Sequence, residues 1–156
     1  MEPAAASLAE LSGRLLRARG FGVLSTLSKR ALGHPFGSVV TYAVDSDGSP
    51  IFLLSRLAVH TTNLLANPKA SLLVFAHEIE SQPLNTPRVT IFGEVTALQE
   101  ADVRDMRALY LARHPESDQW IHFGDFSFYR MLLAEAYYVG GFGVMGWVDG
   151  VDLAAH

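Results

Sequence analysis

Four consecutive side chains that can donate hydrogen bonds stand out in this sequence: His60, Thr61, Thr62 and Asn63. They fall in the first turn of a short helix predicted over residues 57–65, which is ended by the Asn-Pro pair at positions 67–68. The backbone N–H groups at a helix start are unpaired and carry a partial positive charge, so an anion there meets backbone and side-chain donors together. The pattern predicts a phosphate-binding site.

A β-hairpin is predicted to position this helix. Residues 36–44 and 51–55 alternate small or hydroxyl side chains with apolar ones, which is typical of strands. Between them, Asp47 and Gly48 have the turn chemistry that closes an antiparallel hairpin. Ser55 stands where the second strand ends, so its hydroxyl is expected close to the start of the helix.

The rest of the chain predicts a mainly β fold with flanking helices. Apolar residues at helical spacing predict helices over residues 3–19 and 100–113, and a second short helix is expected at 118–123. Further strands are predicted at 21–28, 70–76, 87–97, 126–133 and 136–140. At least six strands at short spacing, without regular alternation with helices, favour an antiparallel barrel of the α+β class over a doubly wound sheet.

Composition limits the function. The 156 residues fit one domain, and 49% hydrophobic with only 18% charged residues indicates an apolar surface that meets a partner subunit. The net charge of −4, without a stripe of Lys and Arg, argues against nucleic acid and anionic membranes. No run approaches the ~20 apolar residues of a membrane span. The absence of cysteine excludes disulfides and thiolate chemistry and suits the cytoplasm.

Three catalytic patterns are rejected. Residues 141–146 spell G-x-G-x-x-G, but only ten residues follow Gly146, too few for a dinucleotide fold, so a glycine-rich bend is expected. The six histidines show neither H-x-H nor H-E-x-x-H spacing, and no metal site is predicted. The G-x-S-x-G signature of serine hydrolases is missing as well. No residue is a convincing catalytic acid or base.

Five segments in order resemble the FMN-binding split β-barrel superfamily of pyridoxamine 5'-phosphate oxidase, in particular its oxidase-like and haem-utilisation branch. They are residues 33–38, 55–64, 86–93, 110–115 and 140–143. The resemblance implies an antiparallel split β-barrel of the FMN-binding type in a single domain, residues 1–156. A helix at about 3–19 would precede a barrel at about 20–148, followed by a short C-terminal tail.

The resemblance also implies which residues bind FMN. The strand along the cofactor falls on residues 37–42, and Ser55 would bond the ribityl chain or the phosphate. The implied cofactor-binding residues are Gly37, Ser38, Val39, Val40, Ser55, Arg56, His60, Thr61, Asn63 and Arg88. The phosphate donors are neutral where oxidases of the superfamily often have Arg or Lys, with Arg56 restoring part of the charge, and Arg88 would reach the cofactor across a dimer interface.

Each of these roles has a structural alternative. Ser38 can be the solvent side of an alternating strand, Ser55 a loop hydroxyl, and Thr61 or Thr62 a plain helix cap with His60 on the surface. Arg88 can form a surface salt bridge.

Three functions remain open. The first is a cytoplasmic homodimeric FMN-dependent oxidoreductase of unknown substrate, with the cofactor site at the dimer interface. Basic residues that help oxidases hold the substrate phosphate are missing after Arg130, which argues against vitamin B6 oxidation itself. The second is a haem-binding protein of the same superfamily, with a histidine as iron ligand. The third is a noncatalytic regulatory module.

Overall fold

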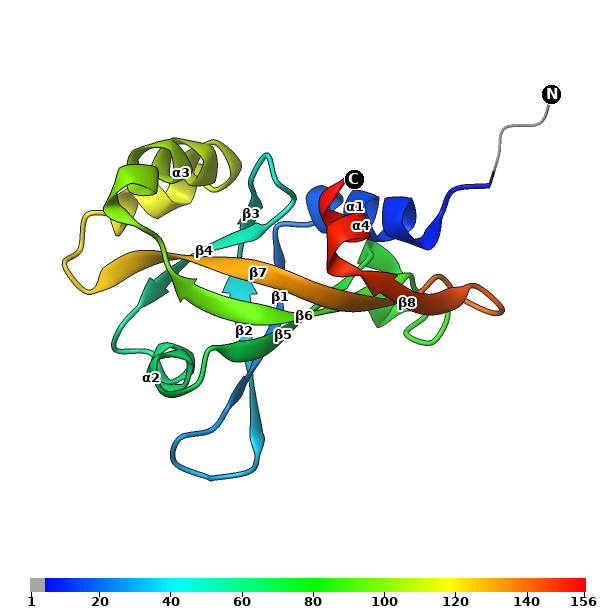
Figure 1. The fold of residues 1–156 in the computed structure, drawn as a ribbon, viewed down its shortest axis with the longest axis horizontal. Coiled ribbons are helices and arrows are strands. Elements are labelled where there is room, and N and C mark those ends of the chain that lie inside the picture. Colours follow the sequence, from blue (N-terminus) through cyan, green and yellow to red (C-terminus); the bar gives the residue numbers. More distant parts are fainter. Residues whose placement is uncertain (1–4) are drawn as a thin grey trace.

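The computed structural model describes residues 5–156 and contains an eight-stranded antiparallel sheet that curls into a half-barrel (Figure 1). Its strand order is β2-β1-β5-β6-β7-β4-β3, with β8 added to β7. The strands are β1 (Phe21–Leu27), β2 (Pro35–Thr41), β3 (Ala43–Val44), β4 (Pro50–Ser55), β5 (Lys69–Phe75), β6 (Arg88–Ala97), β7 (Phe126–Val139) and β8 (Met145–Asp149). The predicted antiparallel split barrel with flanking helices is confirmed.

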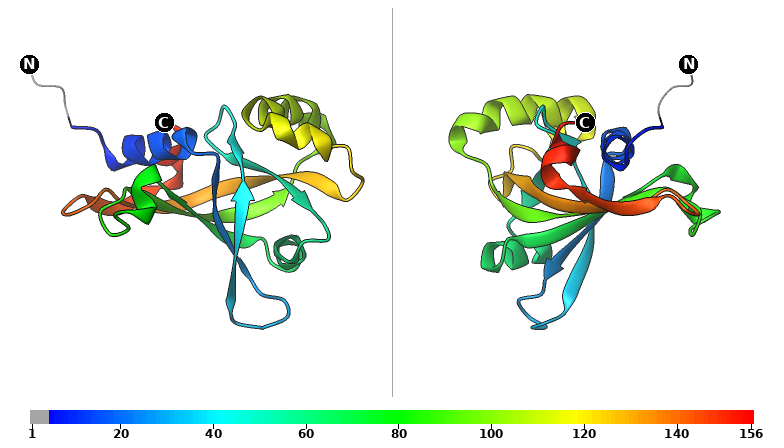
Figure 2. Two further views of the ribbon diagram at one scale, coloured as in Figure 1. Left: turned by 180° about the vertical axis from the view of Figure 1, so that it is seen from behind. Right: turned by 45° about the vertical axis from the view of Figure 1, so that its right-hand side comes forward.

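Helices cover the openings of the half-barrel (Figure 2). The helices are α1 (Leu8–Ala18), α2 (Val59–Ala66), α3 (Glu100–Arg113) and α4 (Gly150–Ala154), with short 3-10 helices η1 (His77–Glu80) and η2 (Pro115–Gln119). Only the first two residues of the helix predicted at 118–123 are helical, at the end of the 3-10 helix η2, and the remaining positions form turns and a bend. Within residues 5–156, no helix combines the length and apolar content needed to span a bilayer.

Helix α1 begins at a capping box. The Ser7 hydroxyl accepts from the Glu10 N–H, and the Glu10 carboxylate accepts from the Ser7 N–H. Leu16 is buried in the main core, against the inward faces of the strands, and Leu8, Leu11 and Leu15 pack beside it. The helix predicted at residues 3–19 thus forms over Leu8–Ala18, while its positions 3 and 4 lie outside the described residues.

The strand predicted over residues 36–44 is not continuous, and that part of the prediction is wrong. Strand β2 pairs with β1 along its whole length, whereas only Ala43 and Val44 pair with β4. At the break, the Tyr42 N–H donates to the Gly20 carbonyl and the Tyr42 carbonyl accepts from His114 Nε2. The predicted turn does form, with Gly48 at φ +79°. Strand β2 therefore pairs with β1 and not with β4, and the barrel is split between β2 and β4.

The two strands predicted at 126–133 and 136–140 are a single strand, β7. Its pairing with β6 shifts register between Phe92 and Gly93, where Ala134 is the additional residue of a β-bulge. A Cβ on Gly93 would lie 2.1 Å from the backbone carbonyl oxygen of Leu132, so glycine is required there. The bulge interrupts the alternation of side chains, which made one strand look like two in the sequence.

The C-terminal residues form strand β8, at the end of the predicted barrel region, and helix α4, within the predicted short C-terminal tail. Strand β8 pairs with β7 across a hairpin in which Gly141 and Gly143 have positive φ. The G-x-G-x-x-G sequence therefore belongs to a hairpin and to the start of β8, in agreement with the rejection of a dinucleotide site. Helix α4 follows and places Leu153 in the main core, next to α1.

Candidate functional site

The split between β2 and β4 forms a cavity of about 280 Å³ next to the start of α2. It is lined by Val39, Val40, Thr41, Leu53, Leu54, Ser55, Ala58, His60 and Phe126. Four of these were predicted as cofactor residues: Val39, Val40, Ser55 and His60. The strand break at Tyr42 makes this cavity possible, because β2 follows β1 away from β4 and leaves the space open.

His60 is the only imidazole in the lining of this cavity, and it is half-buried. Burial lowers the pKa of His60 below its ordinary value of 6.5, since the charged form loses hydration. The ring is thus neutral at neutral pH and retains a nitrogen lone pair. A neutral imidazole beside aliphatic and aromatic walls can ligate a metal carried by a bound cofactor.

Ser55 is held by hydrogen bonds at the end of β4. Its hydroxyl donates to the carboxylate of Asp125 and accepts from the N–H of Leu57. The group is therefore more than a free loop hydroxyl. The Asp125 carboxylate next to it is a negative charge beside the place where the sequence predicted a phosphate contact.

Helix α2 begins at Ala58, whose side chain has no polar group to cap the first backbone N–H groups. The Thr62 hydroxyl donates back to the Ala58 carbonyl, so neither threonine is the plain N-cap of the structural alternative. Thr61 is fully buried, and its Oγ1 has no hydrogen-bond partner within residues 5–156. Unpaired donors thus remain at the start of α2.

Asn63 is buried and its amide group is already used within the protein. Its Oδ1 accepts from the Lys29 N–H at 2.9 Å, and its Nδ2 donates to Thr26 Oγ1 at 3.0 Å. The side chain attaches α2 to β1 and to the loop that follows β1. Asn63 has a structural role that its place in the run of polar residues did not reveal.

The other predicted residues lie around the cavity or away from it. Gly37 and Ser38 precede the lining residues on β2, and Arg56 is exposed between β4 and α2. Arg88 begins β6, and Val95 near the other end of β6 donates to the Pro68 carbonyl just after α2. Seven residues of strand place Arg88 about 23 Å from that contact. Arg88 is not among the residues that line the cavity, and its Nη1 donates to the carbonyls of Leu84 and Thr86.

Sequence reasoning missed several residues at this site. Phe126 lines the cavity, and Tyr110 bonds to Thr41 from α3. Thr41 lay inside the predicted cofactor strand, but no local pattern connects Phe126 or Tyr110 to it. Among residues 5–156, no three His, Asp or Glu side chains gather as a metal site.

The chain matches one protein family and is similar to two proteins named as haem oxygenases. The family described as "CREG, beta-barrel" matches residues 3–154. The chain is 46% identical over 120 residues to "Non-canonical heme oxygenase HOZ, chloroplastic" of Arabidopsis thaliana, covering 77% of this chain and 36% of that protein. It is 27% identical over 128 residues to "Heme oxygenase HutZ" of Vibrio cholerae, covering 79% of this chain and 72% of that protein.

A solved structure gives the same picture. The "heme binding protein from Mycobacterium smegmatis" superposes with a TM-score of 0.90 at 31% identity, covering 98% of this chain and 62% of the mycobacterial one. The chain therefore spans about a third of the plant protein and less than two thirds of the mycobacterial chain.

Proposed function

On the premise that this chain belongs to the CREG β-barrel family, we propose that it binds haem in the cavity between β2 and β4, with His60 as iron ligand. The observation that carries the proposal is the half-buried, neutral imidazole in an apolar cavity. Relatives named for haem support it. They favour the haem alternative over the FMN oxidoreductase that the sequence put first, because the relatives described above are named for haem and not for flavin.

The residues of the cavity suit a macrocycle. Val39, Val40, Leu53 and Phe126 offer apolar contacts for a flat hydrophobic ring, and His60 offers the nitrogen that haem iron takes in many proteins. The unpaired N–H groups at the start of α2 and the exposed Arg56 would donate hydrogen bonds to the carboxylates of the haem side chains. The donors predicted for a phosphate are equally suited to a carboxylate.

The size of the cavity implies that one subunit does not enclose the ligand. About 280 Å³ lies just below the range of ~300–1,000 Å³ for cavities that bury most of a small ligand. A macrocycle would extend onto the neighbouring surface, where Leu57 and Val59 are exposed. A second subunit would cover the remaining part.

We propose that the second subunit is another copy of this chain. The face of the sheet that carries Val39 also carries Leu132 and Trp147, which are 76%, 57% and 62% exposed. Trp147 packs against Phe92 and Tyr137 and forms an aromatic cluster on that face. Burying it between two copies would remove a large apolar area from water. Arg88 lies on the same face, so in such a dimer the Arg88 of one subunit would approach the cavity of the other subunit.

An enzymatic role is proposed on the likeness to the plant protein alone. Bound haem supplies iron that can activate oxygen, while this chain's own residues would bind it, orient it through His60 and exclude water with the apolar walls. Opening of the haem ring by a haem-loaded sample with a reductant and oxygen would appear as loss of haem absorbance with formation of a linear tetrapyrrole. If the haem absorbance stays constant under those conditions, the protein binds haem but does not open its ring.

A second candidate is FMN, favoured by the buried, unpaired Thr61 hydroxyl at the start of α2. The two cofactors are distinguished by incubating the purified protein with haem and FMN together and measuring which spectrum remains after gel filtration. We expect haem at one equivalent per chain or per dimer. Retention of FMN with no haem would reverse the assignment. A noncatalytic module would retain neither cofactor at tens of micromolar and would instead copurify with a protein partner.

A further inference from the structure

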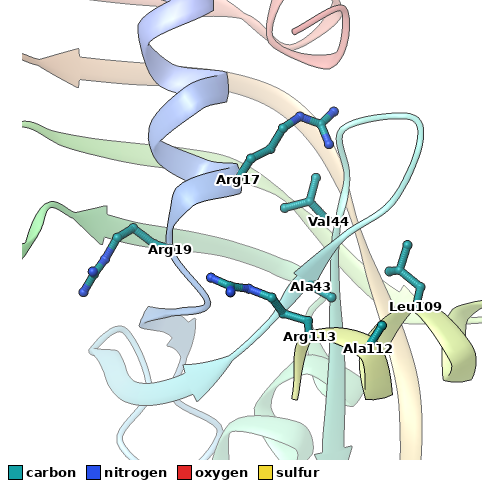
Figure 3. A pocket seen from close by; sticks show the side chains of 7 residues that line it. All are labelled: Arg17, Arg19, Ala43, Val44, Leu109, Ala112 and Arg113. Atoms are coloured by element: carbon teal, nitrogen blue, oxygen red, sulfur yellow. The ribbon is translucent and has the colours of Figure 1, made fainter. Parts of the chain in front are cut away.

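Three arginines line a second cavity (Figure 3). Arg17 and Arg19 come from the end of α1. Figure 3 shows the Arg113 side chain directed from the end of α3 toward the side of Arg19, while the Arg17 side chain extends away from both. The cavity measures about 340 Å³, and its remaining walls are apolar: Ala43, Val44, Leu109 and Ala112. A neighbouring cavity of about 520 Å³ shares Arg19 and Arg113. We call the two together the arginine cavity.

In the described part of the chain, no Asp or Glu side chain pairs with these three arginines. Within residues 5–156, no Asp or Glu oxygen lies within 4.0 Å of their guanidinium nitrogens. Arg17 Nε donates to the His156 carbonyl and Arg113 Nη2 donates to the Ala18 carbonyl. The acceptor of Arg113 is an internal peptide carbonyl, which is neutral, so this contact leaves the positive charge of Arg113 uncompensated.

Arg19 is the most constrained of the three, with only 8% of its surface exposed. Its Nη1 lies 2.7 Å and 2.6 Å from the two ring nitrogens of His77, and its guanidinium carbon lies 5.0 Å from the centre of the Phe21 ring. Its Nε is buried and has no hydrogen-bond partner in the described part of the chain. Buried N–H groups without an acceptor are rare because they lose their hydration without replacement. A bound oxygen would supply the missing acceptor.

One carboxylate, that of Glu116, does line the larger part of the arginine cavity. It lies 3.4 Å from His114 Nδ1, and the other ring nitrogen, Nε2, bonds the Tyr42 carbonyl. Glu116 is thus directed to His114 and not to the arginines. The Glu116 carboxylate would repel an anion on its own side of the cavity. An anion is therefore expected on the side lined by the arginines.

Helix capping accounts for part of this arrangement. Cations are favoured at helix C-termini, and the backbone bonds of Arg17 and Arg113 fit that role. Capping does not account for the unpaired Nε of Arg19. It also does not explain why the arginines surround a hollow with apolar walls, since a cap needs no cavity.

We infer that the arginine cavity binds an organic anion, with an apolar body against Val44, Leu109 and Ala112 and a carboxylate held by Arg19 and Arg113. The planar fork of arginine matches the two oxygens of a carboxylate, and burial beside apolar walls strengthens such bonds. This site goes beyond the proposed haem function. It differs from the haem site in its residues, since only Thr41 lines both cavities.

The test is calorimetric titration of the whole chain with sodium octanoate, beside 1-octanol and inorganic phosphate. We expect saturable binding of octanoate at one per chain, with octanol and phosphate at least about tenfold weaker, because each lacks one half of the recognised chemistry. Arg113→Gln should weaken octanoate at least about tenfold, and Ala112→Phe should abolish binding by filling the cavity. Arg104→Gln, the same charge change on the exposed side of α3, is the matched control and should leave it unchanged.

Arg113 and Ala112 are exposed, so both variants should fold, which circular dichroism would verify. Absence of octanoate binding, or equal binding in the Arg113→Gln and Arg104→Gln variants, would overturn the inference and leave the arginines as helix caps. Phosphate binding as tightly as octanoate would overturn the apolar part of it. Haem binding should be the same in wild type and Arg113→Gln. The result for haem and the result for octanoate are therefore independent, and each can fail without the other.

Discussion

The hydroxyl groups of Thr41 and Tyr110 lie 2.7 Å apart and join the last residue of β2 to the last turn of α3. Tyr110 is buried, and its ring packs edge-on against Phe128. Burial raises the pKa of Tyr110, so its hydroxyl keeps its proton. Because Thr41 lines both the cavity between β2 and β4 and the arginine cavity, this bond holds the wall between them.

Removal of the Tyr110 hydroxyl is expected to weaken that wall. Tyr110→Phe should lower the free energy of unfolding by about 0.5–1.5 kcal/mol, the usual value of one hydrogen bond, without loss of the packed ring. Thr41→Val should cost a similar amount, and the double variant should cost less than the sum of the two. Urea denaturation measures all three. Strictly additive losses would show that the two hydroxyls do not interact in solution.

Gly93 is expected to be indispensable for the β-bulge. Gly93→Ala would place a Cβ 2.1 Å from the Leu132 carbonyl oxygen, and backbone atoms cannot move aside easily. We expect a loss of stability of about 3 kcal/mol, at the upper end of overpacking effects. Gly124→Ala is the matched control, because no atom lies within 4 Å of its Cβ position. Equal melting temperatures for the two variants would contradict the observed register of β6 and β7.

Acid should destabilise the protein through His60. Its folded-state pKa lies below 6.5, so between the two pKa values the unfolded chain binds more protons than the folded one. This contribution to stability is fully present above pH 6.5 and is lost as the pH falls through 6.5 toward the lower folded value. Urea denaturation at about pH 7.5 and about pH 5.5 should show a smaller pH dependence for His60→Gln than for wild type. An identical pH dependence would mean that His60 is not buried.

Charge on the exposed face of the sheet should separate the proposed dimer. Leu132→Glu introduces a carboxylate into the apolar patch, where burial without a partner is costly. Sedimentation at micromolar concentration should give a dimer for wild type and a monomer for this variant. Val151→Glu, the same kind of change at an exposed apolar position on α4, should remain dimeric. A monomeric wild type would refute the dimer, while a dimeric Leu132→Glu would place the interface elsewhere.

The parts of the fold that depend on local sequence were predicted well. The helix at 100–113 and the strands at 21–28, 70–76 and 87–97 agree with α3, β1, β5 and β6 to within two residues. Their apolar periodicity reflects one buried face that the chain keeps along the whole element. This periodicity can be read from the residues of each element alone, without knowledge of distant contacts.

The errors lie where distant residues decide the outcome. Strand β2 ends before Tyr42, because Gly20 and His114 bond the backbone groups of Tyr42, and nothing near Tyr42 in the sequence shows this. Within the candidate site, the nearness of Val39, Ser55 and His60 was predicted because they flank one predicted hairpin and helix. The arginine cavity was not, because Arg19 and Arg113 lie 94 positions apart in the printed sequence and meet only through packing of α1 and α3.

A haem titration of wild type, His60→Ala and His122→Ala, followed at the Soret band, tests the central claim most directly. His122 is exposed and lies outside the cavity, so it controls for loss of any histidine. We predict a shifted Soret band that saturates in wild type and His122→Ala and is lost or returned toward free haem in His60→Ala. An unchanged Soret band in His60→Ala would contradict the proposal that His60 holds the iron, and no shift in wild type would contradict haem binding itself.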